Sequence, residues 1–300
     1  MKKDPGFAKG SAEASVDRKS RPPADKLNEM FALDGKVAAI TGGGGVLFGA
    51  VARGLAELGV KVAALDLRLN EAQATADDIA KNGGEAIGVE ADVLKQESVQ
   101  KACDLILAKY KRIDILINGA GGNHPKATTR KEDGIHFTEL SIDGIRFTFD
   151  LNIMGTVIPC MVFAKAMIKQ GAGVIINTSS MSADTPLSRV PAYSAAKAGI
   201  SNFTKWLAAD MAMNHSAKIR VNEIRPGFFP TLQNADLINK TPGVLTASRG
   251  SDIIGGTPMK RYGRPEELLG GIVYFCSASA AFVTGSSLAI DGGFGSFCGV

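Results

Sequence analysis

The sequence predicts an α/β protein built on one doubly wound parallel sheet of about seven strands, with helices on both faces. Short apolar runs alternate with amphipathic helical stretches from residue 36 to residue 292. The runs are apolar throughout rather than at every second position, which is typical of strands covered on both faces. A glycine-rich segment, TGGGG at 41–45, directly follows the first run, where such sheets bind ligands.

Each element of this sheet is assigned from its composition and periodicity. Seven segments have the apolar, β-branched character of strands, and they are residues 36–41, 61–66, 85–93, 112–119, 173–180, 218–225 and 287–292. Helical patterns fill the connections, at residues 51–59, 71–84, 96–110, 141–170, 191–214 and 265–277. Because helices separate the strands, we expect a parallel sheet that binds its ligands beyond the carboxyl ends of the strands.

Two parts of the chain fall outside this pattern. Residues 1–30 are expected to form a flexible N-terminal tail, because the first 26 contain three prolines and few large apolar side chains. The tail either stays disordered or docks on a neighbouring subunit. Residues 31–300 are expected to form one catalytic domain, in which the irregular segment 228–256 closes over a substrate as a lid.

Composition excludes several classes of function. The net charge is +4 and aromatic residues make up 6%, with lysine and arginine scattered along the chain. This favours a small anionic partner over nucleic acid. The four cysteines have no CxxC spacing and there are three histidines, so we expect no metal site and reduced thiols. We expect neither a membrane span nor a signal peptide, and therefore a cytoplasmic protein.

The glycine-rich segment is the first candidate binding site. Glycines allow a diphosphate to approach the backbone, and the N-terminus of the following helix offers free N–H groups. The alternative is a flexible turn without a ligand. We expect Gly42, Gly44, Gly45, Val46 and Leu47 to lie against the diphosphate of a dinucleotide.

Acidic residues end the second and third predicted strands. Asp66, about 20 residues beyond the glycines, is placed to accept hydrogen bonds from the ribose hydroxyls, which favours NAD over NADP. Arg68 is the counter-argument, because a guanidinium can bind a 2′-phosphate, although it can equally be a solvated loop cation. Asp92, with Val93 beside it, either contacts the adenine or caps a helix.

The segment PAYSAAKAG, residues 191–199, contains a tyrosine four residues before a lysine. On a helix Tyr193 and Lys197 share one face, so they form either a chemical pair or a chance neighbourhood. A lysine ammonium near the phenol would favour the phenolate, and this is the basis of an acid/base role for Tyr193.

Taken together and in this order, the motifs resemble those of the short-chain dehydrogenase/reductase family over about residues 34–293. Besides the segments above they include NGAG at 118–121, Asn152 in DLNIMGT, Ser180 in NTSSM, Pro226–Gly227 with Thr231, and DGG at 291–293. The resemblance implies a Rossmann domain, an NAD(H)-dependent oxidoreductase and commonly a homotetramer. Apolar residues that could face a partner, or equally the sheet, are Ile153, Val157, Met161, Phe203 and Trp206.

The resemblance also implies roles for individual residues. Tyr193 is the general acid/base, Ser180 donates a hydrogen bond to the reacting oxygen, Lys197 holds the nicotinamide ribose, and Asn152 positions a water. Thr231 meets the carboxamide, and the remaining expected cofactor contacts are Asn118, Gly119, Ala120, Gly121, Pro226, Gly227 and Phe229. Structural alternatives stay open, since Asn152 can simply interrupt helical bonding and Ser180 can simply satisfy a turn.

Two departures from the family pattern point to a branch. Val46 and Phe48 stand where later glycines are usual, and Gly119 replaces an asparagine. With the segments 118–129, 186–208 and 225–234, they resemble the D-mannonate oxidoreductase (fructuronate reductase) branch. That implies reversible reduction of the C5 ketone of D-fructuronate with NADH. Alternatives are another polyol or aldonate dehydrogenase, such as a gluconate 5-dehydrogenase, and a dinucleotide sensor without turnover.

Substrate residues are sought in the long loop between Asn118 and Asn152, since such loops usually carry function. Candidates for a sugar-acid carboxylate are Asn123, His124, Lys126 and, least favoured, Arg130, together with Arg189 from the segment before Tyr193. An arginine would give the best carboxylate geometry. Each cation can equally be solvated, and Pro125 can make His124 a structural corner.

Overall fold

The computed structural model describes residues 24–231 and 249–297. It contains a seven-stranded sheet in the order β3-β2-β1-β4-β5-β6-β7, in which every pair of neighbouring strands is parallel. The predicted doubly wound α/β fold is therefore confirmed. The strands are β1 Val37–Thr41, β2 Lys61–Asp66, β3 Ala86–Glu90, β4 Ile115–Asn118, β5 Gly173–Thr178, β6 Ile219–Pro226 and β7 Ser287–Ile290.

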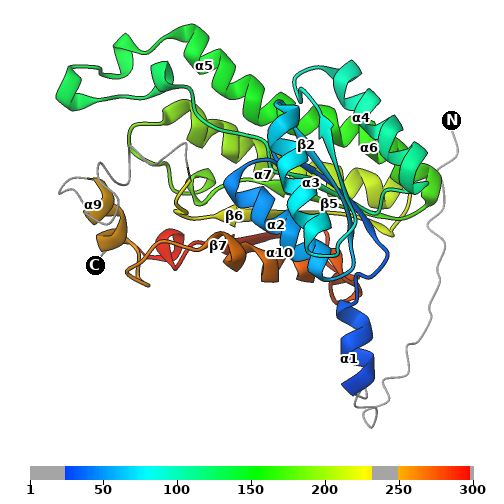
Figure 1. The fold of residues 1–300 in the computed structure, drawn as a ribbon. Helices are drawn as coiled ribbons and strands as arrows, with labels where there is room; N and C mark the ends of the chain where they lie inside the picture. Colours follow the sequence, from blue (N-terminus) through cyan, green and yellow to red (C-terminus); the bar gives the residue numbers. More distant parts are fainter. Residues whose placement is uncertain (1–23, 232–248, 298–300) are drawn as a thin grey trace, which may run out of the picture.

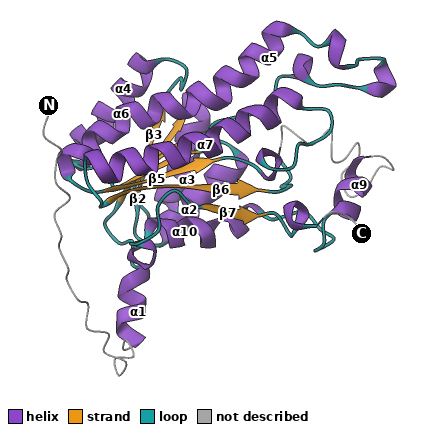
Figure 2. Ribbon diagram, turned by 180° about the vertical axis from the view of Figure 1, so that it is seen from behind, coloured by secondary structure: helices purple, strands orange, loops and turns teal. Residues whose placement is uncertain are grey.

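Helices cover both faces of the sheet (Figures 1 and 2). One layer contains α4 Gln96–Tyr110, α6 Gly155–Gln170 and α7 Pro191–Asn214, and the other contains α2 Val46–Glu57, α3 Leu69–Lys81 and α10 Leu269–Cys276. Two shorter helices are α5 Ile142–Phe149 and α9 Arg249–Gly256. The expected lid, 228–256, falls mostly on residues 232–248, which lie outside the described residues.

The tail expected over residues 1–30 needs a correction at its end. Residues Ala24–Phe31 form helix α1, although this segment has the charged composition of a tail. Ser279 Oγ donates a hydrogen bond to the Met30 carbonyl at 3.2 Å, which attaches the helix to the 3-10 turn Ala278–Ala280 that follows α10 Leu269–Cys276. Its exposed Leu27 and Phe31 show that little of it is buried.

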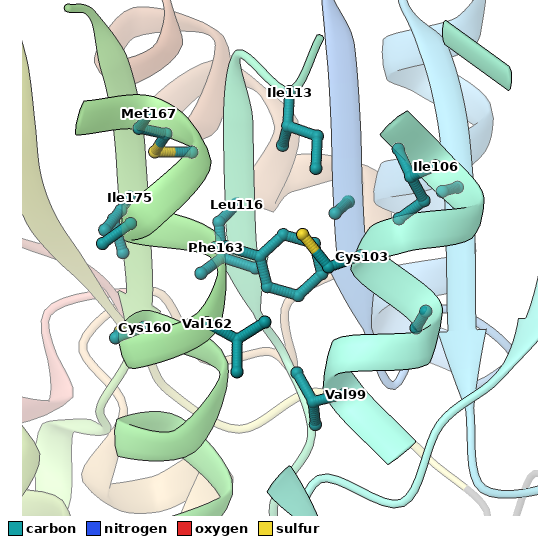
Figure 3. Packing of buried hydrophobic residues seen from close by; sticks show 14 of the residues in the cluster. Val99, Cys103, Ile106, Ile113, Leu116, Cys160, Val162, Phe163, Met167 and Ile175 are labelled. Atoms are coloured by element: carbon teal, nitrogen blue, oxygen red, sulfur yellow. The ribbon is translucent and has the colours of Figure 1, made fainter. Parts of the chain in front are cut away.

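One hydrophobic core lies on each face of the sheet. Figure 3 shows the core beneath α4 and α6, where Phe163 packs among Leu116, Val162 and Cys103. The second core joins α2 and α10 to the opposite face. Cys103, Cys160 and Cys276 are buried and free, as expected of reduced thiols, and Cys298 lies outside the described residues.

Helices α5 and α6 are joined by a π-helical turn, Asp150–Met154, into one helical stretch. This stretch, Ile142–Gln170, is long and apolar enough to cross a membrane, which the sequence-based expectation overlooked. Half of its most apolar window is buried inside the fold, where α6 packs against α4 and the sheet. Burial against protein explains the apolar composition of a helix in this layer.

Candidate active site

Tyr193 and Lys197 lie one helical turn apart on α7, beside the carboxyl end of β5. The Lys197 Nζ atom is 5.4 Å from the centroid of the Tyr193 ring. The same ammonium donates a hydrogen bond to the Thr178 carbonyl at 2.8 Å, and the Lys197 residue is 3% exposed. The two side chains that the sequence proposed as a pair are thus brought together at the ligand-binding edge of the sheet.

Burial changes the proton affinity of both groups. Desolvation lowers the pKa of Lys197 to about 7, and the charge of Glu223 acts in the opposite direction. Desolvation raises the pKa of Tyr193 above its ordinary value, while a hydrogen bond with Ser180 acts against that rise. Tyr193 is therefore a phenol near neutral pH, which is the form that can give a proton to a substrate oxygen.

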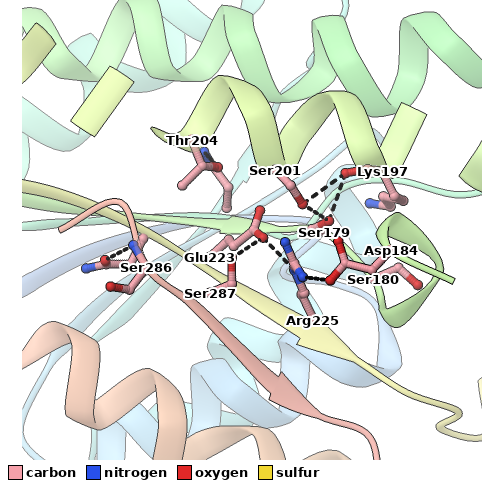
Figure 4. Close-up of polar contacts among 12 residues, drawn as sticks. Ser179, Ser180, Asp184, Lys197, Ser201, Thr204, Glu223, Arg225, Ser286 and Ser287 are labelled. Carbon is pink, nitrogen blue, oxygen red and sulfur yellow. Dashed lines mark hydrogen bonds and ion pairs between the residues drawn. The ribbon is translucent and has the colours of Figure 1, made fainter. Parts of the chain in front are cut away.

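Ser180 and Ser179 are neighbours with different surroundings. Ser180 hydrogen-bonds Tyr193 and also accepts the N–H of Ser182 at 3.1 Å, so it serves the turn and the tyrosine together. Ser179 instead donates to the Lys197 carbonyl and lies 2.8 Å from the hydroxyl of Ser201, inside the sheet–helix interface (Figure 4). The geometry places Ser180, and not Ser179, against the phenol.

Asn152 lies in the π-helical turn between α5 and α6, and is fully buried. Its amide donates to the carbonyls of Gly122 and Thr148, both at 2.7 Å, and its Oδ1 accepts the Gly122 N–H at 3.3 Å. These bonds hold the turn after β4 against the helix, and the π-helical turn itself is the interruption of helical bonding that the sequence offered as the structural alternative for Asn152. π-Helical turns of this kind are frequent at functional sites.

Glycines at the ends of β1 and β4 keep side chains out of the site. Gly42 has φ +68°, and a Cβ there would lie 3.1 Å from backbone atoms of Gly119 and Ala120. A Cβ at Gly121 would lie 2.9 Å from Asn152 Oδ1 and 3.3 Å from Lys197 Nζ. The two turns therefore approach each other and the lysine as closely as they do only because these positions lack side chains.

The segment after β1 has the features of a diphosphate cradle. Gly45 is the N-cap of α2 and gives no side-chain cap, so the first amides of the helix keep their hydrogen-bonding capacity for an anion. A Cβ at Gly44 would lie 2.7 Å from the backbone carbon of Glu71 at the start of α3. Val46 is 41% exposed and Leu47 is half-buried beside it, so this rim is open to a ligand.

The two departures from the family pattern meet in space. Phe48 is buried, and a Cβ at Gly119 would lie 2.3 Å from its Cγ. The phenyl ring occupies the space that a side chain at residue 119 would need. The Thr41 hydroxyl, which the sequence reading passed over, accepts the N–H groups of Gly119 and Ala120 at 3.1 and 3.2 Å and fixes the turn.

Asn118 ends β4 inside a buried polar cluster. Its amide donates to Asn177 Oδ1 at 2.9 Å, and Asn177 in turn donates to Thr204 of α7 at 2.9 Å. Asn118 Oδ1 has no hydrogen-bond partner within the part of the chain that the structure describes. The structure gives Asn118 a role in joining β4 to β5 and α7, beside the expected cofactor site.

The expected adenosine-binding residues lie at the ends of β2 and β3. Asp66 Oδ1 accepts the Arg68 N–H at 3.2 Å, and Arg68 Nε is 3.8 Å from the carboxylate of Glu71. Asp92 Oδ1 accepts the Leu94 N–H at 3.0 Å, and its Oδ2 pairs with Lys95 at 3.1 Å. Asp92 therefore organises the turn before α4. Val93 is buried and would contact a Cβ at Gly155.

The segment after β6 is packed against the end of β7. The Gly227 N–H donates to the Ile290 carbonyl at 2.9 Å, and a Cβ at Gly227 would lie 2.6 Å from Asp291 Cα. Pro226 ends β6, and Phe229 is buried over Gly263. Thr231 is half-buried and is the last residue described before the gap at 232–248.

Two of the proposed substrate residues, Asn123 and His124, form hydrogen bonds within their own loop. His124 Nδ1 accepts the Lys126 N–H at 3.1 Å, and the ring packs edge-on against Phe147, as expected of a structural corner. Asn123 donates to Thr128 Oγ1 at 2.7 Å. Lys126 is exposed, and Arg130, the weakest candidate, pairs with Asp133.

Arg189 lies in the second loop that borders the site. It has φ +75°, and its carbonyl accepts the Thr129 N–H at 2.9 Å, which connects the loop before α7 to the loop after β4. The residue is half-buried and takes part in a further interaction. The structure therefore brings Arg189 next to the first loop, but it does not gather the predicted cations into one cluster.

Sequence reasoning missed two charged residues of β6, Glu223 and Arg225, that lie beside the site. Glu223 is fully buried and accepts hydrogen bonds from Arg225 Nε at 2.7 Å and Ser287 Oγ at 2.6 Å (Figure 4). Arg225 also pairs with Asp184, which follows the Ser180 turn. The signal was present in KIRVNEIR, where four charged residues, Glu223 and Arg225 among them, occur in a segment with the pattern of a buried strand.

No group of histidine, cysteine and carboxylate side chains suited to a metal ion occurs within residues 24–231 and 249–297. The polar groups around Tyr193 are instead hydroxyls, amides and one lysine. Their arrangement can deliver a proton to an oxygen atom and hold a charge beside it.

Comparison with known proteins agrees with this chemistry. Residues 36–241 match the family described as short chain dehydrogenase. The chain is 46% identical over 275 residues to "Uncharacterized oxidoreductase UxuB" of Bacillus subtilis, covering 89% of this chain and 98% of that protein. It is 32% identical over 264 residues to 2-dehydro-3-deoxy-D-gluconate 5-dehydrogenase of Escherichia coli, covering 88% of this chain and 96% of the relative.

Two solved structures are similar in both sequence and fold. One is named a "putative D-Mannonate oxidoreductase from Haemophilus influenza" with bound NAD, and is 42% identical with a TM-score of 0.83 over 89% of this chain and 98% of that one. The other is a gluconate 5-dehydrogenase from Burkholderia cenocepacia with NADP and tartrate, 30% identical with a TM-score of 0.79 over 90% and 99% of the chains. The chain belongs to the short-chain dehydrogenase family and is an oxidoreductase.

Proposed function

We propose that this oxidoreductase uses NADH to reduce the C5 ketone of D-fructuronate reversibly to D-mannonate. The observation that carries the proposal is the cluster of Ser180, Tyr193 and Lys197 at the carboxyl end of β5, next to the glycine turns of β1 and β4. A phenol bonded to a serine and backed by a lysine is suited to proton transfer at a carbonyl oxygen.

The glycine turns fit a dinucleotide, since a side chain at Gly42 or Gly44 would collide with neighbouring backbone and displace the turn in front of α2. Bound NADH would supply the hydride to the carbonyl carbon. Tyr193 gives its hydroxyl proton to the carbonyl oxygen, and Ser180 donates a hydrogen bond to the same oxygen. Lys197 holds a positive charge near the phenolate that remains. A proton from solvent then converts this phenolate back to the phenol.

Cofactor preference follows from charge at the end of β2. Asp66 and Glu71 are two carboxylates close to the glycine turn, and both would repel a 2′-phosphate. Arg68 is the cation that could bind that phosphate, but its guanidinium already lies against Glu71. This arrangement supports NAD as the cofactor of this chain, as found in the Haemophilus structure.

The substrate proposal draws support from the comparisons and from the distribution of cations. The 42% identical structure is named for D-mannonate, a six-carbon sugar acid. Lys126 and Arg189 come from the two loops that Thr129 joins at the edge of the site, so a carboxylate could be bound there. The second candidate is gluconate 5-dehydrogenation, which the 30% identical Burkholderia structure favours.

We also propose a cytoplasmic homotetramer. Met161 on α6 and Trp206 on α7 are 54% and 62% exposed, whereas Ile153, Val157 and Phe203 are half-buried. Large apolar side chains exposed on two long helices favour contact with a second copy. Light scattering of the purified protein would test this, and replacement of Trp206 by glutamate should reduce the measured mass.

The function is tested by the loss of NADH absorbance with D-fructuronate, with 5-ketogluconate, fructose and NADPH in parallel. Turnover of D-fructuronate with NADH supports the proposal. A higher kcat/KM for 5-ketogluconate or fructose would identify that ketone as the substrate instead, and the reaction would still be reduction of a ketone by NADH. Substitution of Lys126 or Arg189 by methionine should then raise the KM for the acid but not the KM for NADH.

A dinucleotide sensor without turnover is the alternative from another class. It predicts NADH binding by fluorescence with no oxidation of NADH on any of these ketones. The buried Tyr193–Lys197 pair argues against it, because a sensor has no need of a desolvated lysine beside a phenol.

A further inference from the structure

Glu223 and Arg225 are charges placed inside the sheet. Residues two apart on a strand point to the same face, and here that face is covered by α7. Val221, on the same side of β6, packs in the core with Leu207 and Met211 of α7. Glu223 therefore lies beneath the helix that carries Tyr193 and Lys197, as Figure 4 shows.

The carboxylate of Glu223 is only partly satisfied. Its Oε1 accepts hydrogen bonds from Arg225 Nε and Ser287 Oγ, whereas its Oε2 has no partner among residues 24–231 and 249–297. The residue is 0% exposed. A buried acceptor without a donor is unfavourable, so its retention calls for an explanation.

The charges around Glu223 do not cancel among themselves. Asp184 and Glu223 share the single guanidinium of Arg225, so this trio carries a net negative charge. Asp184 is 69% exposed and its charge is screened by water, but that of Glu223 is not. The uncompensated negative charge therefore lies inside the protein, on the side that faces α7.

Lys197 is a buried cation on α7, the helix that covers this side of the sheet. Its ammonium donates to the Thr178 carbonyl and has no carboxylate within ion-pair distance among the described residues. Glu223 pairs in register with Asn177 of β5, next to the Thr178 whose carbonyl binds this ammonium, and its charge opposes the lowering of the Lys197 pKa by desolvation. An ammonium buried without any negative charge nearby tends to lose its proton.

We propose that Glu223 is a positioning residue for the reaction, and that its buried negative charge keeps Lys197 in the ammonium form. The inference rests on the proposed roles of Tyr193 and Lys197. Arg225 and Ser287 hold the carboxylate in place, and the free Oε2 leaves part of its charge directed to the α7 side. The ammonium in turn stabilises the phenolate that Tyr193 becomes after giving up its proton.

Other charged groups on the elements around Lys197 are few. Tyr193 shares its helix, β5 carries no charged residue, and the π-helical turn contributes Asp150, which is exposed. Asp143 and Arg146 of α5 are exposed and paired with each other. Glu223 is thus the buried carboxylate that can offset desolvation of the lysine.

The direction of the effect follows from these charges. Desolvation already lowers the pKa of Lys197 to about 7, and removing the charge of Glu223 would lower that pKa further. In Glu223→Gln the ammonium would therefore be lost at a lower pH. The high-pH limb of kcat/KM, which requires the ammonium, should move toward lower pH by the same amount.

The experiment is a pH titration of Lys197 by NMR in the full chain, with lysine labelled by ¹³C at Cε. The Lys197 signal is assigned by its absence in Lys197→Arg. We expect Glu223→Gln to shift the midpoint down by about one pH unit. Glu223→Asp, which keeps the charge, should shift it by less than half as much, and the alkaline limb of NADH oxidation should follow.

Ser287→Ala is the matched control, since it removes a hydrogen bond to the same carboxylate and keeps its charge. Its midpoint should stay within a few tenths of a pH unit of the wild type. An unchanged midpoint in folded Glu223→Gln would overturn the proposal. If that variant does not fold, Arg225→Gln decides, because it removes the cation that partly offsets the buried carboxylate: an upward shift of the midpoint is expected, and no shift would overturn the proposal. The proposed function fails independently of this inference. Turnover retained in Tyr193→Phe would contradict the role of the tyrosine, whereas the titration of Lys197 needs no substrate and tests only the effect of Glu223.

Discussion

The two sides of the site are built in different ways. On the cofactor side, the turns after β1 and β4 are shaped by missing side chains, since a Cβ at Gly42, Gly44, Gly119 or Gly121 would meet atoms at 3.1 Å or less. On the substrate side, the loop after β4 is held by side chains that bind backbone groups: His124 accepts the Lys126 N–H, and Asn123 donates to the His124 carbonyl. A family can keep the glycine turns constant and vary the loops of the second side, because loop side chains can change without altering the turns.

Tyr193 lies between these two sides, and its removal should have the largest effect. Tyr193→Phe keeps the ring and removes the proton donor, so kcat should fall by about 10²- to 10⁴-fold. The dissociation constant for NADH, measured by fluorescence, should change by less than threefold, since the glycine turns remain. Ser179→Ala serves as a control with a neighbouring hydroxyl that does not face the phenol. Retained turnover in Tyr193→Phe would assign the proton to another group.

The cofactor side is broken most directly by adding one methyl group. In Gly44→Ala the new Cβ would lie 2.7 Å from the backbone carbon of Glu71, and backbone cannot move aside. We expect unfolding free energy to fall by about 1–3 kcal/mol, and NADH affinity to fall about tenfold as the turn shifts.

Gly270 on α10 provides the matched control, because a Cβ there meets nothing within 4 Å. Gly270→Ala should be neutral or stabilise by about 0.5–1 kcal/mol through helix propensity, with NADH affinity unchanged. Denaturant unfolding and NADH titration of both variants test the contrast. Equal behaviour of the two alanines would mean that the turn adapts and that its glycines are not required by packing.

These contacts explain what the sequence could and could not predict. The seven strands, their parallel sheet and the glycine turn after β1 were predictable, because apolar periodicity and glycine spacing reflect backbone geometry directly. Helix α1 was missed since Ala24–Phe31 has few large apolar residues, and α2 begins at Val46 rather than 51 because glycine-rich segments resemble loops. The contact of Phe48 with Gly119 joins positions far apart in the chain, so no local pattern contains it.

Glu223 was missed for a different reason. A charge inside a buried strand is visible in the sequence, but its partner Ser287 and the Asp184 that shares Arg225 with it come from segments far away in the chain. The same limit applied to the substrate side, where Lys126 and Arg189 could be named as cations but their surroundings could not. Side chains that act through tertiary partners become interpretable only when those partners are placed.

A smaller effect is expected where the cofactor side depends on charge rather than on shape. Asp66→Asn removes the carboxylate that repels a 2′-phosphate, so the ratio of kcat/KM for NADH over NADPH should fall about tenfold. Asp104→Asn, on the exposed face of α4, should leave the ratio unchanged. If Asp66→Asn also leaves it unchanged, discrimination lies elsewhere on this side, with Glu71 as the next residue to replace.

The smallest effect is expected on the substrate side, and it distinguishes a structural corner from a ligand. His124 Nδ1 accepts the Lys126 N–H, so His124→Ala should weaken the loop by about 0.5–1 kcal/mol and raise the substrate KM only a fewfold. Asparagine can accept the same N–H two residues ahead, and His124→Asn should therefore restore both stability and KM. If both variants instead raised the KM more than tenfold at unchanged stability, His124 would be a substrate ligand. The side chains of the substrate side would then bind the substrate as well as hold the loop, and the two sides of the site would differ in function as well as in construction.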